Sequence, residues 1–100
     1  MFIAILDFET AAGDRDRALA QLESERPFVR SMPGNLAFRV YASREDDRTV
    51  TVVHEWADQT SFAAYVASEA FARSNDVLRP LIIGGPVSRR FRAELVESVA

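Results

Sequence analysis

The stretch TVTVVHEWADQTSFAAYVASEAF, residues 49–71, decides how the chain folds. Its first eight residues, Thr49 to Trp56, are mostly β-branched or aromatic and predict a half-buried strand. Asp58 is typical of a helix N-cap, because its carboxylate can accept hydrogen bonds from backbone N–H groups of the first turn. After it, apolar side chains recur at helical spacing at Phe62, Val66 and, less regularly, Tyr65. The stretch therefore predicts a strand, a turn and a helix.

His54 and Trp56, the only histidine and the only tryptophan, lie two residues apart in this strand. Since side chains alternate between the two faces of a strand, both point to the same face and can form part of a pocket wall. The imidazole can act as a general base near neutral pH, or it can be held by a backbone or carboxylate partner. The indole can stack on a planar ligand or belong to the core.

The composition predicts one soluble globular domain over residues 1–100, with 48% hydrophobic and 27% charged residues. The net charge of −3 without a basic stripe argues against nucleic acid as a partner. No apolar run approaches the ~18 residues that cross a membrane, and no signal peptide is recognisable. We therefore expect no membrane association and, by default, a cytoplasmic protein.

Missing residue types limit the chemistry. Cysteine is absent, so disulfides and thiolate metal sites are excluded, and one histidine cannot supply a zinc site. Every basic side chain is arginine, which rules out Schiff-base chemistry on lysine. There is no glycine-rich phosphate loop and no Gly-x-Ser-x-Gly elbow. We expect neither a metal nor a cofactor.

The rest of the chain supplies three further strands, predicted at Phe2–Phe8, Asn35–Arg44 and Val87–Val96. In the second of them one face is predicted to hold Leu36, Phe38, Val40 and Ala42. Arg39, on the other face, is expected to pair with Glu55 across the sheet or across a dimer. Two loops are predicted at Glu45–Arg48, as a charged hairpin turn, and at Leu81–Pro86, as an apolar loop containing glycine.

Two further helical segments are predicted. The first spans Asp14–Met32 and contains Pro27, which should kink it or split it in two. The second begins after Ser68 as its cap and ends at Pro80, and one of its faces holds Phe71, Asn75 and Leu78. A buried amide in that position needs partners, so Asn75 either anchors local backbone or contacts a ligand.

The order of elements is β-α-β-β-α-β, which predicts a ferredoxin-like α+β fold with an antiparallel sheet and its helices on one face. The first strand is apolar on both faces, because Ile3 and Ile5 oppose Phe2, Ala4, Leu6 and Phe8. A second copy of the chain is the expected cover for the bare face, in a homodimer with facing sheets. Asp7 shares the face of Ile3 and Ile5, and it either reaches water or lies at the mouth of a pocket.

This pattern resembles the antibiotic biosynthesis monooxygenase (ABM) family of dimeric α/β barrels over nearly the whole chain. The resemblance rests on Met32-Pro33-Gly34-Asn35-Leu36, on Glu55-Trp56-Ala57-Asp58, on Phe62 with Ser68-Glu69-Ala70-Phe71, and on the Leu81–Pro86 segment. The family includes cofactor-independent oxygenases of aromatic polyketides, haem-degrading enzymes and small quinone-forming enzymes.

The resemblance implies roles for individual positions. Trp56 matches a tryptophan that lines the pocket in the polyketide oxygenases and the haem-degrading members. Four positions depart from the family: Val52 replaces an asparagine, Phe62 a pocket tyrosine, Tyr65 a histidine, and Asn75 lies near the axial histidine of the haem-degrading members. Because asparagine is a poor haem ligand, the resemblance implies haem degradation least.

The leading hypothesis is a cofactor-independent monooxygenase, or a related small oxidoreductase, acting on a phenolic or quinone-like aromatic compound. His54 would be the base and Trp56 the stacking wall. The substrate-binding residues would be Asp7, Phe62, Tyr65, Phe71 and Asn75, with the Tyr65 hydroxyl either reaching water or donating to a bound oxygen. The alternatives are a dimeric protein that binds a small ligand without turnover and, third, haem degradation.

Overall fold

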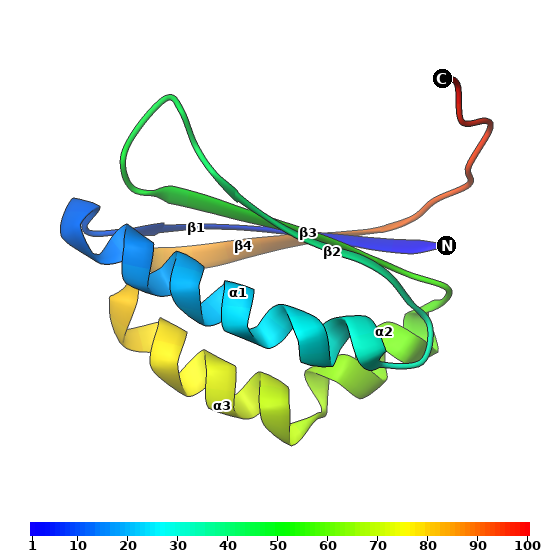
Figure 1. Cartoon of the computed structure of the whole chain (residues 1–100), viewed down its shortest axis with the longest axis horizontal. Coiled ribbons are helices and arrows are strands. Elements are labelled where there is room, and N and C mark those ends of the chain that lie inside the picture. The colour runs from blue at the N-terminus through cyan, green and yellow to red at the C-terminus, as the bar shows by residue number, and fades with distance from the viewer.

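The computed structural model describes residues 1–100 and has one sheet covered on one face by helices (Figure 1). The strands are β1 (Phe2–Thr10), β2 (Asn35–Ala42), β3 (Thr49–Trp56) and β4 (Ile82–Arg92). The helices are α1 (Arg15–Ser31), α2 (Gln59–Val66) and α3 (Glu69–Leu78), with short 3-10 turns at Ala12–Asp14 and Arg79–Leu81. All strand pairs are antiparallel in the order β2-β3-β1-β4. The predicted ferredoxin-like α+β fold is therefore confirmed.

The segment that decides the fold has the predicted structure. β3 covers the predicted residues, and its helix-facing side chains are all buried: Val50, Val52, His54 and Trp56. The Asp58 carboxylate accepts a hydrogen bond of 2.8 Å from the backbone N–H of Ser61 and caps α2. Hydrogen bonding from Ser61 lowers the pKa of Asp58. The Ser68 hydroxyl accepts from the Phe71 N–H at 3.2 Å and caps α3. Both predicted caps are confirmed.

The last strand differs from the prediction at both ends. β4 begins at Ile82, so most of the predicted loop Leu81–Pro86 belongs to the strand. The strand ends at Arg92, whereas the sequence predicted its end at Val96. Its pairing with β1 shifts register between Asp7 and Glu9, beside Gly84, whose φ of 71° favours glycine. β4 is an edge strand, which tolerates the missing N–H of Pro86. Alternation cannot be followed through a bulge, so the sequence pattern showed only the second half of the strand.

Three smaller details also differ from the expectation. Of the two outcomes predicted for Pro27, a kink or a split, the split does not occur: α1 runs through the proline as one helix, and residues on both sides of it, Leu22 and Val29, are buried. Leu36 is 49% exposed, because a register irregularity next to it removes it from the face of Phe38. Val66 is 38% exposed, and Tyr65 occupies the buried position of α2 instead.

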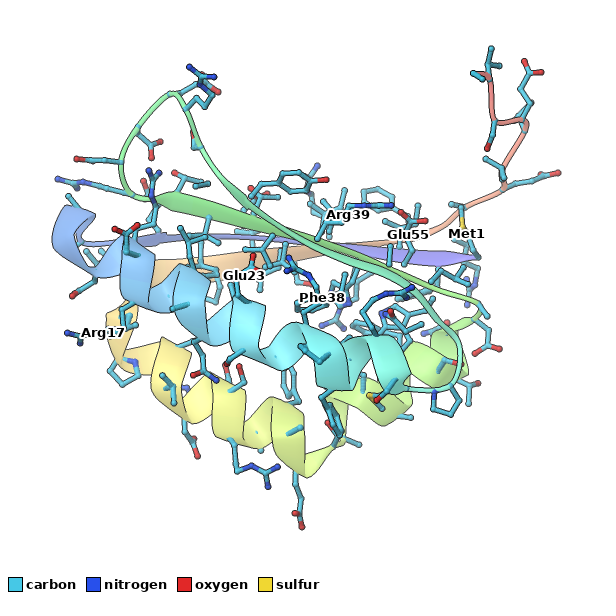
Figure 2. The ribbon with its side chains drawn as sticks, in the orientation of Figure 1. Met1, Arg17, Glu23, Phe38, Arg39 and Glu55 are labelled. Atoms are coloured by element: carbon cyan, nitrogen blue, oxygen red, sulfur yellow. The ribbon has the colours of Figure 1, made fainter.

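The two faces of the sheet have different surroundings. Figure 2 shows Phe38 on the side of the helices and Arg39 and Glu55 on the opposite side, where the two side chains pair at 3.1 Å. On that opposite side no helix covers the strands. Its apolar side chains are half-buried or exposed: Ile3, Ile5, Tyr41, Val53, Val87 and Phe91. No helix of the chain is both long and apolar enough to cross a membrane.

Candidate functional site

A cavity of about 200 Å³ lies between the sheet and the helices, and 11 of its 18 lining residues are hydrophobic. Its sheet side includes Leu6 of β1, Phe38 of β2 and His54 of β3, and its helix side is formed by all three helices. The exposed residues Ser88 and Arg90 of edge strand β4 line it as well, so we place its mouth there. A mostly apolar cavity with a few convergent polar groups is typical of a small-molecule site.

His54 is the polar group on the sheet side of the cavity, and it is only 6% exposed. Its Nδ1 accepts a hydrogen bond of 2.8 Å from Nε1 of Trp56. An indole nitrogen can only donate, so Nδ1 must be the unprotonated nitrogen of the ring. The proton of the neutral imidazole then sits on Nε2, which is left free for a ligand.

The surroundings of His54 keep it neutral. Burial and, to a smaller extent, the positive charge of Arg90 together lower the pKa of His54 from 6.5 to about 4. A neutral imidazole whose only lone pair is already bound to Trp56 offers a ligand an N–H donor and no acceptor. This geometry favours a donor role for His54 over the base role expected from the sequence.

Trp56 supports the site from behind and does not line the cavity. Its side chain is fully buried, and its ring stacks on Tyr65 with centroids 5.5 Å apart and an angle of 26° between the planes. Phe62 approaches it edge-on at 6.5 Å. Trp56 has one face stacked on Tyr65, its N–H bound to His54 and no exposed surface, so it orients His54, and the structure gives no support to the expected stacking on a ligand.

The helix side of the cavity carries a second polar cluster. Glu25 of α1 accepts from the Tyr65 hydroxyl at 2.7 Å and from the Ser74 hydroxyl at 2.7 Å, and all three side chains are buried. Burial raises the pKa of Tyr65, and the charge of Glu25 and their hydrogen bond raise it further. The Tyr65 hydroxyl therefore stays protonated and points to Glu25, not to water.

Sequence reasoning found some of these residues and missed others. Phe62, Tyr65, Phe71 and Asn75 all line the cavity, as expected. Glu25 and Ser74 were missed, although Glu25 shares the apolar face of its helix with Leu22 and Val29 at helical spacing, which was a readable signal.

Asp7 lies away from the cavity, on the uncovered face of the sheet. It accepts from the Thr51 hydroxyl at 2.5 Å and pairs with Arg89 at 3.5 Å. Its partly exposed carboxylate corresponds to the expectation that it reaches water, and the structure does not bring it to the other predicted site residues.

Comparison with protein families gives one match. A family model described as antibiotic biosynthesis monooxygenase matches residues 1–76, three quarters of the chain. No curated protein sequence matches the chain. The matched region contains β1 to β3, α1, α2 and most of α3, and so all the cavity residues except those of the last turn of α3 and of β4.

Solved structures with the same fold are distant in sequence. A candidate antibiotic biosynthesis monooxygenase from Deinococcus radiodurans superposes with a TM-score of 0.90 at 14% identity, over 100% of this chain and 99% of that one. A crystal structure named antibiotic biosynthesis monooxygenase gives 0.85 at 18% identity, over 95% and 100%. A protein from Shewanella oneidensis gives 0.83 at 22% identity, over 90% and 87%. At these identities the likeness shows the fold alone.

Proposed function

Because the chain belongs to the antibiotic biosynthesis monooxygenase family, we propose that it oxidises a small phenolic or quinone-like aromatic compound with dioxygen and without a cofactor. The observation that carries the proposal is the apolar cavity in which the free Nε2–H of His54 is the donor. Such a site can bind an aromatic ring and stabilise negative charge on its oxygen.

The reaction balances without an external reductant. A phenol with a free para position and dioxygen give a para-quinone and water. The phenolate supplies electrons to dioxygen, a C–O bond forms at the para carbon, and the O–O bond then breaks. One oxygen atom stays as the new carbonyl, and the other leaves as water with the hydroxyl and para hydrogens.

Each site residue has a role in this proposal. The Nε2–H of His54 donates to the oxygen on which negative charge develops, and Trp56 holds the ring in the tautomer that makes this donation available. Phe62 and Phe71 form apolar walls that exclude water, and Asn75 offers an amide to polar groups of the substrate. Since His54 is a donor here, the substrate proton must pass to another group.

The size of the cavity limits the substrate. A cavity of about 150 Å³ holds one benzene ring, and pockets for drug-sized ligands begin near ~300 Å³. The observed cavity of about 200 Å³ therefore suits a one- or two-ring aromatic compound better than a three-ring polyketide.

The proposal is tested by oxygen uptake with 1-naphthol, a two-ring phenol, and with dithranol, a three-ring anthrone. The wild type should turn over 1-naphthol faster. His54→Gln keeps an N–H near the position of Nε2 and cannot act as a base, so it should retain activity within about tenfold, whereas His54→Leu should lose about 10²- to 10³-fold. Wild-type uptake equal to that of buffer would contradict the monooxygenase, and equal losses in the two variants would restore the base role.

A second candidate function is binding of a small aromatic ligand without turnover. The apolar side chains of Val52 and Phe62 in the cavity wall favour it, because they offer nothing to a reacting oxygen. Saturable binding of 1-naphthol without oxygen uptake would identify this function. Haem degradation is the weakest candidate, and we expect no protein-bound haem absorption band on titration with haem.

We propose a second copy of the chain as the cover of the uncovered sheet face. The face carries Ile3, Ile5 and Val53 at its centre and the exposed Tyr41, Val87 and Phe91 around them. Ile5 lies opposite Val53 and Ile3 lies opposite Phe91, so these four side chains form an apolar cluster that no helix of the chain covers. Sedimentation equilibrium should give twice the chain mass of 11.2 kDa, and Val53→Arg should give the single chain mass.

A further inference from the structure

Glu25 occupies a position that a hydrophobic residue would fill at lower cost. The buried face of α1 consists of Ala18, Leu22, Glu25 and Val29, and Glu25 is only 7% exposed. Acidic residues are almost never buried without a cationic partner, because taking the charge out of water is unfavourable. Departures from the local pattern of this kind occur mainly at functional sites.

The partners of Glu25 hold its carboxylate in place without neutralising it. None of the ion pairs in the structure includes Glu25, and its two oxygens each accept one hydroxyl, from Tyr65 and from Ser74. Each carboxylate oxygen can accept a second hydrogen bond. Glu25 lines the cavity, so this remaining acceptor capacity is available to a ligand.

We propose that Glu25 is the group that accepts the hydroxyl proton of the bound phenol, an inference that rests on the proposed function. The phenol O–H bond breaks, an O–H bond forms on the carboxylate, and the electron pair stays on the substrate oxygen. The products of this step are a neutral carboxylic acid and a phenolate, whose charge the Nε2–H of His54 then stabilises. The cavity thus offers an acceptor from α1 and a donor from β3.

This assignment makes Glu25 a specificity-determining residue as well. A hydroxyl can donate to the carboxylate, whereas a methyl ether of the same ring cannot and leaves the charge facing an apolar group. Hydrogen bonds to a charged group are among the strongest in proteins. The site should therefore prefer aromatic compounds with a free hydroxyl over their methyl ethers.

The direct test is binding of 1-naphthol and of 1-methoxynaphthalene, measured by fluorescence titration under anaerobic conditions so that no turnover is needed. The wild type should bind the phenol about 10- to 100-fold more tightly than the ether. Glu25→Gln should reduce this preference to a few-fold. The control Glu23→Gln makes the same charge change at an exposed position of the same helix and should keep the full preference.

No preference in the wild type, or an unchanged preference in Glu25→Gln, would overturn the proposal. If Glu25→Gln does not fold, Glu25→Leu carries the same test, because leucine matches the apolar neighbours Leu22 and Val29. A wild type that prefers the phenol but consumes no oxygen would leave Glu25 as a hydroxyl-recognising residue and contradict only the monooxygenase.

A second readout separates a proton acceptor from a merely structural residue. At pH 7 the kcat/KM of Glu25→Gln should be about 10²-fold below that of the wild type. Above the pKa of the phenol the substrate is already ionised and needs no proton acceptor, so the ratio of the two kcat/KM values should approach one. The other titratable or charged groups of the cavity do not titrate in this range: His54 is neutral, the raised pKa keeps Tyr65 protonated, and Arg90 stays charged. A loss that is constant with pH would contradict proton transfer to Glu25.

Discussion

The sheet side and the helix side of the cavity both contain a buried polar group, but the two groups are held by opposite means. On β3 the lone pair of His54 is bound by an N–H of Trp56, and what faces a ligand is a donor. On α1 the oxygens of Glu25 are bound by two hydroxyl groups, and what faces a ligand is an acceptor. The comparison teaches that the protein partner of a buried polar group decides whether this group can donate or accept a hydrogen bond in the cavity.

The largest loss of stability is expected from Trp56→Phe. This substitution removes the N–H that binds His54 and part of a fully buried side chain. An unpaired buried acceptor costs about 1–3 kcal/mol, and the lost volume adds to it, so we expect about 4 kcal/mol less stability in urea unfolding. Phe38→Leu, which removes aromatic volume from the same core without touching a hydrogen bond, should cost about 1 kcal/mol. Equal losses in the two variants would show that the hydrogen bond to His54 contributes nothing.

A somewhat smaller loss of stability is expected when the pH is lowered. The pKa of His54 is about 4 in the folded chain and near 6.5 in the unfolded one, so the unfolded state binds the proton first as pH falls. The contribution of neutral His54 to the free energy of unfolding is fully present above pH 6.5. It is lost as pH falls toward 4, and this loss amounts to up to about 3 kcal/mol.

The control for the acid effect is His54→Gln, which cannot titrate. The difference in urea stability between the wild type and this variant should narrow as pH falls from 7 to 4, because only the wild type loses the contribution of the neutral histidine. Parallel pH profiles would contradict the lowered pKa.

The smallest effect is expected on the helix side. Ser74→Ala removes one of two hydroxyl donors from Glu25 and should cost about 1 kcal/mol in urea unfolding. In a Glu25→Leu background the same change should cost close to nothing, because the partner is already absent. A cost that is the same in both backgrounds would mean that the Ser74 hydroxyl acts independently of the carboxylate.

Much of the fold could be predicted from the sequence, because it follows from local periodicity. Alternation gave β3 and the helix-facing side of β1, and short polar side chains gave the caps at Asp58 and Ser68. The prediction failed where the backbone leaves the regular pattern, beside Leu36 and in the first half of β4. Bulges at these places shift the face of each following side chain. Gly84 lies at the bulge in β4, but in the sequence this glycine was equally compatible with a loop.

The site was predicted less completely than the fold. His54 drew attention because it is the only histidine, but its role depends on the direction of one hydrogen bond from Trp56. Glu25 was not predicted as a site residue, because glutamate is common on the exposed surfaces of helices. Its significance depends on Tyr65 and Ser74, 40 and 49 residues away along the chain, which only the tertiary structure brings to it.

The central claim, that His54 is a neutral donor with its proton on Nε2, can be measured directly by nitrogen-15 NMR of the imidazole. The chain has a single histidine, so its two ring nitrogens give an unambiguous spectrum. We predict a protonated Nε2 and an unprotonated Nδ1 from pH 7 down to about pH 5, with protonation only near pH 4. A proton on Nδ1, or an imidazolium formed near pH 6.5, would contradict the account.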